Sequence, residues 1–159
     1  MPSGDFYNKL TRIISQLSRE YSAPNFESHI TLFGDLIGSE EEILSKTSQL
    51  ATLLQPFEIR LTTLDYLDEY FKCLFIRVEE TKQVMDANFK AREIFNRQQD
   101  PKHIPHLSLM YGNFTPMIKE GIIAKIGRKF NIKFEVGSIH LFTSGEPKNW
   151  RRIKEFKLK

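Results

Sequence analysis

Two short segments of the sequence place a histidine two residues before a hydroxyl side chain. In the first segment His29 precedes Thr31, and in the second His106 precedes Ser108, with one apolar residue between the two polar ones each time. Residues two apart in a β-strand point to the same face of the sheet. If both segments are strands, each therefore presents an imidazole beside a hydroxyl on the face that points away from the core.

This combination of side chains suits the opening of a cyclic phosphodiester. The reaction needs a base that deprotonates the attacking water and an acid that protonates the leaving oxygen. Two imidazoles with ordinary pKa values of about 6.5 can divide these tasks near neutral pH. The hydroxyls of Thr31 and Ser108 can donate hydrogen bonds to the non-bridging phosphate oxygens, where charge develops. We therefore expect His29 and His106 to be a catalytic pair that works without a metal or another cofactor.

A single motif of this kind is weak, because Ser and Thr are common, but the two copies lie in a longer internal repeat. Residues 29–32 match residues 106–109, and each segment is preceded by a proline at the same distance. Farther along, residues 57–61 match residues 130–134. The repeat is too short to be a solenoid. It predicts an α+β fold of two lobes related by a pseudo-twofold axis, each an antiparallel sheet with helices on its outer face, with the active-site cleft between the sheets.

Hydrophobic periodicity and capping residues predict the elements of this fold. We expect helices over residues 6–21, 40–54, 81–97 and 116–128, and strands over residues 27–33, 56–66, 70–79, 104–111, 130–142 and 151–157. The chain 1–159 is then a single two-lobed domain, with one repeat over about 5–66 and the other over about 81–143. Strands 70–79 and 151–157 complete the two sheets.

The repeat also predicts that an element is missing. The helix over 81–97 follows directly on the strand over 70–79, whereas the matching helix over 6–21 has only five residues before it. The N-terminal lobe is therefore expected to lack its first strand. Because such a loss exposes an unpaired sheet edge, we favour a recorded start that lies too far downstream.

Composition predicts a soluble protein of the cytoplasm. The N-terminus lacks the basic and apolar regions of a signal peptide, no apolar run approaches the roughly 20 residues of a membrane span, and one cysteine cannot form an intrachain disulfide. Residues 101–159 carry 12 Lys and Arg against four Asp and Glu, which is compatible with a phosphate-bearing ligand or with a solvated basic surface. We expect a monomer that does not bind membranes.

The sequence resembles the two-histidine phosphoesterase superfamily, which has a pair of His-apolar-Ser/Thr-apolar motifs in two similar lobes. Three segments carry the resemblance, Ala23–Thr31, Tyr70–Phe75 and Pro105–Gly112, and it extends over nearly the whole chain. Within the superfamily, the sequence is most similar to cyclic phosphodiesterases that open ADP-ribose 1″,2″-cyclic phosphate and nucleoside 2′,3′-cyclic phosphates.

The resemblance implies hydrolysis to a phosphomonoester by water, without a metal. It implies that His29 and His106 are catalytic and that Thr31 and Ser108 hold the phosphate. Tyr111 matches a family tyrosine that positions the ligand or the water. In a regular strand, however, Tyr111 would point to the same face as the core residues. It reaches the cleft only if the strand ends or bulges there.

Two further residues are expected to point to the same strand face as the histidines. Phe33 and Met110 occupy equivalent repeat positions, and either they form the wall of the cleft or they pack in the core. His103 and His106 have a spacing that could suggest a metal site, but Pro105 excludes a regular helix and no third ligand is evident, so we predict none. His140, Cys73 and Trp150 are interpreted as structural residues.

We assign activation of water to His106 and protonation of the leaving oxygen to His29, and the near-symmetry of the motifs leaves the reverse assignment open. The substrate is expected to be a small nucleotide or ribose cyclic phosphate. One alternative is an RNA-processing enzyme of the same superfamily that acts on RNA ends, either like a 2′,5′-ligase or as an oligonucleotide phosphodiesterase. Another is a non-catalytic module that binds nucleotides or RNA ends.

Overall fold

Hydroxyl side chains cap three of the four helices. The structure is a computed structural model that describes residues 4–159. The helices are α1 (Gly4–Tyr21), α2 (Glu40–Leu53), α3 (Lys82–Ile94) and α4 (Pro116–Ile126). Ser39, Thr81 and Thr115 each accept a hydrogen bond from a backbone N–H in the first turn of α2, α3 and α4. These caps satisfy donors that the helix itself leaves free, so the predicted starts of these helices are confirmed.

The strands form two antiparallel sheets, as the sequence predicts for an α+β fold. A four-stranded sheet has the order β3-β2-β1-β4, and a two-stranded sheet pairs β5 with β6. Their bounds are β1 (Phe57–Asp65), β2 (Leu74–Val78), β3 (His106–Met110), β4 (Lys129–Val136), β5 (Ser138–Phe142) and β6 (Arg152–Lys157). Two short 3-10 helices, η1 (Tyr70–Lys72) and η2 (Pro147–Asn149), precede β2 and β6.

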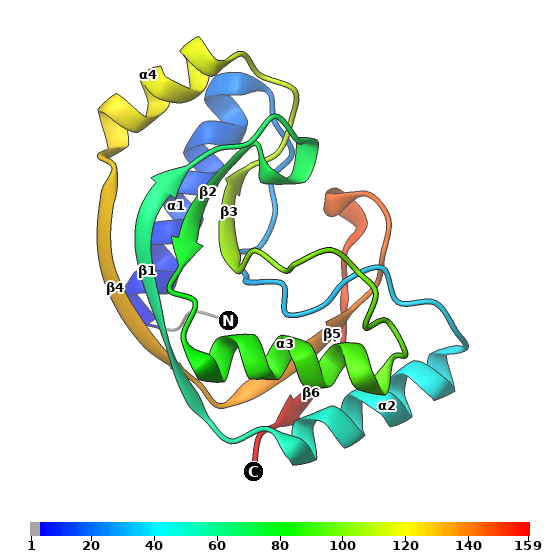
Figure 1. Cartoon of the computed structure of the whole chain (residues 1–159). Helices are drawn as coiled ribbons and strands as arrows, with labels where there is room; N and C mark the ends of the chain where they lie inside the picture. The colour runs from blue at the N-terminus through cyan, green and yellow to red at the C-terminus, as the bar shows by residue number, and fades with distance from the viewer. Residues whose placement is uncertain (1–3) are drawn as a thin grey trace.

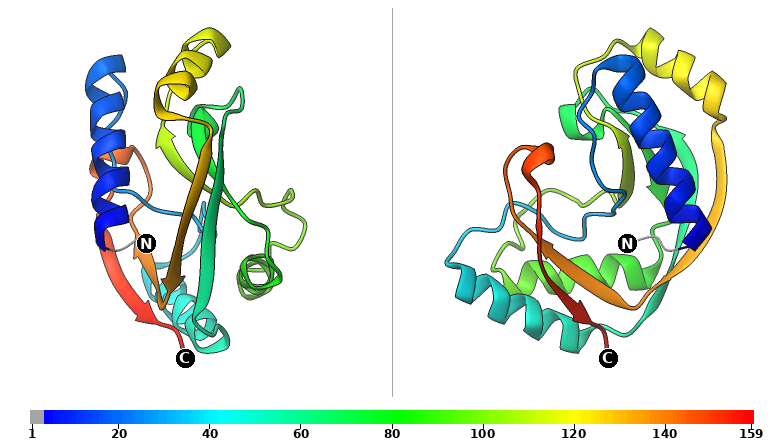
Figure 2. Two further views of the ribbon diagram at one scale, coloured as in Figure 1. Left: turned by 90° about the vertical axis from the view of Figure 1, so that its left-hand side faces the viewer. Right: turned by 180° about the vertical axis from the view of Figure 1, so that it is seen from behind.

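The helices cover both sheets. Seen in Figure 1, α1 lies behind the four-stranded sheet and α3 lies in front of it, and the rotated views of Figure 2 agree. Leu10, Ile14 and Leu17 of α1 are buried in the main core with the strand residues. Helix α2 runs beside α3, and its Ala51 packs on Leu141 and Phe156 of the two-stranded sheet.

The strand pairing has the symmetry that the repeat predicts. Strand β1 pairs with its repeat equivalent β4, and Arg60 pairs directly with its own equivalent Lys133. Far from this pair in sequence, an isolated antiparallel bridge joins Ile30 to its equivalent Leu107. A residue can pair with its own equivalent only where the twofold axis passes between them. The pseudo-twofold axis therefore runs through the sheet and through the two histidine motifs.

Three of the predicted strands differ from the observed ones by more than one or two end residues. Residues 27–33 do not form a strand, because their ladder is reduced to the single bridge at Ile30. The segment 130–142 is divided at Gly137 into β4 and β5, which belong to different sheets. Residues 70–72 form η1 and not the start of β2. The strand expected to be missing would lie ahead of Met1, so residues 4–159, which the structure describes, do not test it.

Strand β3 contains an irregularity that changes the sheet face to which its last side chains point. Ser108 pairs with Phe75 but Met110 pairs with Leu74, so β3 uses one residue more than β2 over this step, as at a β-bulge. Beyond the extra residue, each side chain points to the face opposite to the one it would have in a regular strand. Met110, 1% exposed, and Tyr111, 3% exposed, are both buried in the main core, and Tyr111 lies toward Ser108.

The burial of Met110 predicts a large loss of stability on truncation. We expect Met110→Ala to lower the free energy of unfolding by about 2–5 kcal/mol, because it leaves a cavity in a packed core. Met117 is 81% exposed, so the same change there should cost less than about 0.5 kcal/mol. Urea denaturation of both variants measures the difference, and equal costs would show that Met110 does not lie in the core.

Candidate active site

The bridge between Ile30 and Leu107 brings the two histidine motifs side by side. Each of these residues is the apolar centre of its motif, so antiparallel pairing sets His29 opposite Ser108 and Thr31 opposite His106. All four polar residues are one step from the bridged pair, and they therefore share one face. In such a pair the two histidines are diagonal neighbours, for which a separation of about 7–8 Å between Cα atoms is typical.

Both imidazoles are held in the same way by the backbone. Nδ1 of His29 lies 2.6 Å from the carbonyl oxygen of Glu27, and Nδ1 of His106 lies 2.7 Å from the carbonyl oxygen of Ile104. A carbonyl oxygen only accepts hydrogen bonds, so Nδ1 carries the hydrogen in both rings. In the neutral form of each ring, Nε2 is then the free base.

Burial lowers the pKa of both catalytic candidates. For His29 the loss of solvation is the largest effect, and its hydrogen bond to the Glu27 carbonyl opposes it. The pKa of His106 is lowered first by burial, again opposed by its carbonyl hydrogen bond, and further by the positive charges of Lys72 and His29. The effect of His29 on His106 agrees with the proximity of the two motifs at the Ile30–Leu107 bridge.

The two hydroxyls differ in their surroundings. Thr31 is exposed, whereas Ser108 is 4% exposed and its Oγ donates a hydrogen bond of 3.2 Å to the carbonyl oxygen of Phe71. The Ser108 hydroxyl has to leave this carbonyl before it can donate to a phosphate. At a site with approximate twofold symmetry, one hydroxyl is therefore free and the other is engaged.

A group of aromatic rings lies beside His29. Tyr111 stacks on Phe26 with ring centroids 4.0 Å apart, and Trp150 meets His29 edge to face at 5.5 Å. Burial raises the pKa of Tyr111 to about 12, although a hydrogen bond with Ser108 acts in the opposite direction. Tyr111 is therefore a neutral phenol at physiological pH, able to donate a hydrogen bond.

Sequence reasoning missed Phe26. Trp150 packs against the core, as the sequence predicted, and its ring also borders His29. Trp150 aligns with Tyr70 in the repeat, and the structure places both rings beside Tyr111, at 6.2 Å and 6.4 Å. The matched repeat positions are the signal that could have identified Trp150. The two carbonyls that hold the imidazoles cannot be identified from residue type, since every residue has a carbonyl.

Phe33, Met110 and His140 lie apart from this face, whereas His103 lies near His106. Phe33 packs on Phe95 at 5.6 Å and beneath the Arg97 guanidinium, and Met110 is buried beyond the irregularity of β3, on the face opposite Ser108. His103 is partly buried next to the site, and burial, the neighbouring His106 and Arg92 lower its pKa to about 4. His140 lies on β5 between Ser138 and Glu155.

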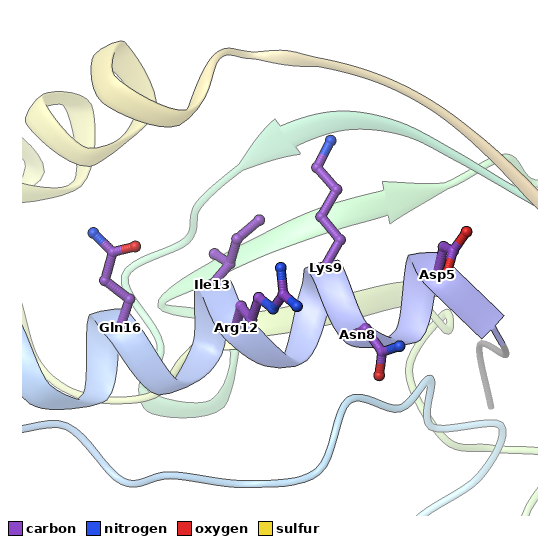
Figure 3. Close-up of a pocket in the computed structure, with 6 residues that line it drawn as sticks. All are labelled: Asp5, Asn8, Lys9, Arg12, Ile13 and Gln16. Carbon is purple, nitrogen blue, oxygen red and sulfur yellow. The ribbon is translucent and has the colours of Figure 1, made fainter.

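A hollow on the surface of α1 lies elsewhere. Figure 3 shows its lining of mostly polar side chains, among them Lys9 and Arg12, all from one helix. It contains neither histidine motif, so we do not place the reaction there. Within residues 4–159, no group of three or more His, Cys, Asp or Glu side chains is arranged to hold a metal ion. In the same range no helix is both long and apolar enough to cross a membrane.

An α+β fold of antiparallel sheets with two paired His-x-Ser/Thr motifs defines the class of two-histidine phosphoesterases. A family model described as the 2′-5′ RNA ligase superfamily matches residues 5–148. The chain therefore belongs to this superfamily, and the resemblance noted in the sequence is confirmed.

Individual relatives are distant in sequence but similar in fold. A cyclic phosphodiesterase of Arabidopsis thaliana is 22% identical over 115 residues, which cover 72% of the chain and 64% of that relative. The protein TT0787 of Thermus thermophilus superposes with a TM-score of 0.69 at 18% identity, covering 99% of this chain and 93% of the other. E. coli LigT, solved in complex with 3′-AMP, has a TM-score of 0.64 at 14% identity, covering 94% and 91%.

The anchoring of both rings predicts their protonation states. We expect nitrogen-15 NMR to find the hydrogen on Nδ1 in the neutral forms of His29 and His106, and to find both pKa values below 6.5 because burial disfavours the charged ring. Assignment uses His29→Gln and His106→Gln, each of which removes one set of signals. A neutral ring with its hydrogen on Nε2 would contradict the observed anchoring.

Proposed function

We propose that the protein hydrolyses a ribose cyclic phosphodiester to a phosphomonoester by paired-histidine acid and base catalysis without a metal. One observation carries the proposal: the bridge between the motifs sets two imidazoles on one face, each held at Nδ1 and free at Nε2. An in-line displacement needs a base and an acid on opposite sides of the phosphorus. Two diagonal imidazoles with outward Nε2 atoms suit this requirement.

In this mechanism a neutral imidazole takes a proton from water at Nε2 while the water attacks phosphorus. The other imidazole, protonated, donates its Nε2 proton to the leaving ribose oxygen. The carbonyls of Glu27 and Ile104 stabilise each ring when it is positively charged. Thr31 and Ser108 donate to the non-bridging oxygens, and the Tyr111 phenol positions the ligand or the attacking water.

The charges around the two rings favour His106 as the base and His29 as the acid. Beyond burial and the carbonyl bonds, the carboxylate of Glu27 raises the pKa of His29, which favours its protonated form. Lys72 and His29 lower the pKa of His106, although Glu69 acts in the opposite direction. Burial, the largest effect, lowers the pKa of both rings, and the neighbouring charges of Glu27 and Lys72 are what distinguish them, acting toward a protonated His29 and a neutral His106.

The substrate we favour is ADP-ribose 1″,2″-cyclic phosphate or a nucleoside 2′,3′-cyclic phosphate. The similarity to the plant cyclic phosphodiesterase supports a cyclic ester, and E. coli LigT has been solved with the nucleotides 3′-AMP and NADP+. A small ribose cyclic phosphate fits a face that presents two imidazoles and two hydroxyls. We place the activity in the cytoplasm.

Removal of either imidazole should abolish most of the activity. We expect His29→Ala and His106→Ala to lower kcat by about 10²–10⁴-fold on both substrates, because each removes one proton-transfer step. The assay contains excess chelator, which should leave the wild-type rate unchanged. His140→Ala is the matched control, since His140 lies on β5 outside the site and its loss should leave the rate unchanged. Full activity in His29→Ala or His106→Ala would refute the paired mechanism.

The rate should have a bell-shaped dependence on pH. One imidazole has to be neutral and the other protonated, so kcat/KM of the free enzyme falls on both sides of a maximum. Because burial lowers the pKa of both rings, the maximum should lie below about pH 6.5. Steady-state assays between pH 4.5 and 8 measure the profile, and a flat profile between pH 5 and 8 would exclude this division of roles.

An enzyme of RNA ends is the second candidate. The description of the matched family as 2′-5′ RNA ligases favours it. The same site would then act on a phosphodiester that joins or closes RNA ends. Comparing turnover of a mononucleotide 2′,3′-cyclic phosphate with that of an oligonucleotide carrying the same terminal group separates the two, because an RNA-end enzyme should prefer the longer substrate.

A further inference from the structure

Helix α3 is tied by side chains to the backbone on both sides of the candidate site. Asn88 is 4% exposed, and its Nδ2 donates a hydrogen bond of 2.7 Å to the carbonyl oxygen of Leu32, the residue after Thr31. Its Oδ1 accepts a hydrogen bond of 2.9 Å from Nε of Arg92, one turn later in the helix. Both ends of the buried amide are therefore satisfied, and its orientation is fixed.

Arg92 continues this chain of hydrogen bonds to the second motif. Its guanidinium donates to the carbonyl oxygen of Asp100 at 2.9 Å and also to that of Pro101. These carbonyls belong to the first two residues of the segment 100–105, which leads into β3. The same segment contains Ile104, whose carbonyl accepts a hydrogen bond from the imidazole of His106. Three acceptors around one planar guanidinium define its position closely.

Asn88 and Arg92 together link Leu32 to Pro101. These two residues belong to segments that share little backbone hydrogen bonding. Residues 27–33 reach β3 through one isolated bridge at Ile30, with no ladder to fix their distance. Arg97, which follows α3, adds a second tie: it donates to the carbonyls of Gly34 and Asp35 and forms an ion pair with Asp100. In Figure 1 the loop before α2 and the loop before β3 both pass over α3.

We propose that Asn88 and Arg92 are positioning residues that set the separation of His29 and His106. The proposal rests on the proposed function, since the separation matters for transfer of two protons at one phosphorus. The two side chains bond to each other and to backbone carbonyls of the motif segments, so they act through the backbone. Because a displacement of about 1 Å can cost about 10²-fold in rate, loosening the link should slow the chemical step.

Two conservative variants break the link at different points. Asn88→Asp keeps the acceptor for Arg92 but loses the N–H that binds the Leu32 carbonyl. Arg92→Lys keeps the positive charge, but a single ammonium group cannot reproduce the fork that reaches three acceptors. We expect each variant to lower kcat by about 10–100-fold with less than about threefold change in KM, and the double variant to lose little more, because both changes break one link.

Lys90→Met is the matched control. Lys90 also lies on α3, and its Nζ donates a hydrogen bond of 2.8 Å to the carbonyl oxygen of Leu53, which ties α3 to α2 and not to a histidine segment. Its loss should leave kcat unchanged. Thermal unfolding of all variants, followed by circular dichroism, identifies any rate loss that merely reflects partial unfolding at the assay temperature.

A second measurement tests the separation without turnover. The pKa of His106, followed by NMR, should rise when His29 is replaced by Ala in the wild-type background, because a positive charge is removed nearby. In the Arg92→Lys background this rise should become smaller, since the rings are farther apart. An undiminished rise would overturn the proposed positioning even in an inactive protein.

The outcomes separate the two proposals. If the wild type turns over a cyclic phosphate and both conservative variants retain its kcat, the positioning role is wrong and the proposed function stands. An increase confined to KM, or an equal loss of kcat in Lys90→Met, would also overturn the positioning role. If the wild type hydrolyses no cyclic phosphate, the proposed function fails, and only the NMR comparison then bears on the geometry.

Discussion

The isolated bridge between Ile30 and Leu107 is the contact on which the candidate site depends. Through this single backbone pairing, two motifs that are far apart in the chain come to share one face. The apolar partners make the pairing while their neighbours supply the imidazoles and hydroxyls. Because the bridge has no ladder around it, the rest of the fold has to stabilise it. The sheet holds β3 from the other side, and α3 holds the loops that flank both motifs.

Burial of the site works against the charge that catalysis requires. Desolvation lowers the pKa of both histidines, and the carbonyls of Glu27 and Ile104 oppose it. These hydrogen bonds persist in the charged ring, because Nδ1 donates in both protonation states. Approximate symmetry therefore supplies two similar groups, and the unequal neighbours Glu27 and Lys72 make them different. A duplicated fold can thus support an asymmetric reaction.

Much of the site could be predicted from the sequence because its residue types repeat. The motifs identified His29, Thr31, His106 and Ser108, and the matching segments predicted a twofold relation that strand pairing displays at Arg60 and Lys133. The sequence did not predict that residues 27–33 lack a ladder, because alternation describes which face is buried and not whether a partner strand exists. Nor did it show how the imidazoles are held, since the acceptors are main-chain carbonyls.

The extra residue in β3 has a consequence for how this site tolerates change in chain length. Between Ser108 and Met110 the strand is one residue longer than its partner, and this alone turns Tyr111 toward the Ser108 side and Met110 into the core. Deleting Leu109 would give a regular ladder and leave Met110 and Tyr111 on their present faces, at the cost of one buried side chain. This short stretch should therefore tolerate loss of one residue better than a regular strand does, in which a shift by one residue turns every following side chain to the other face.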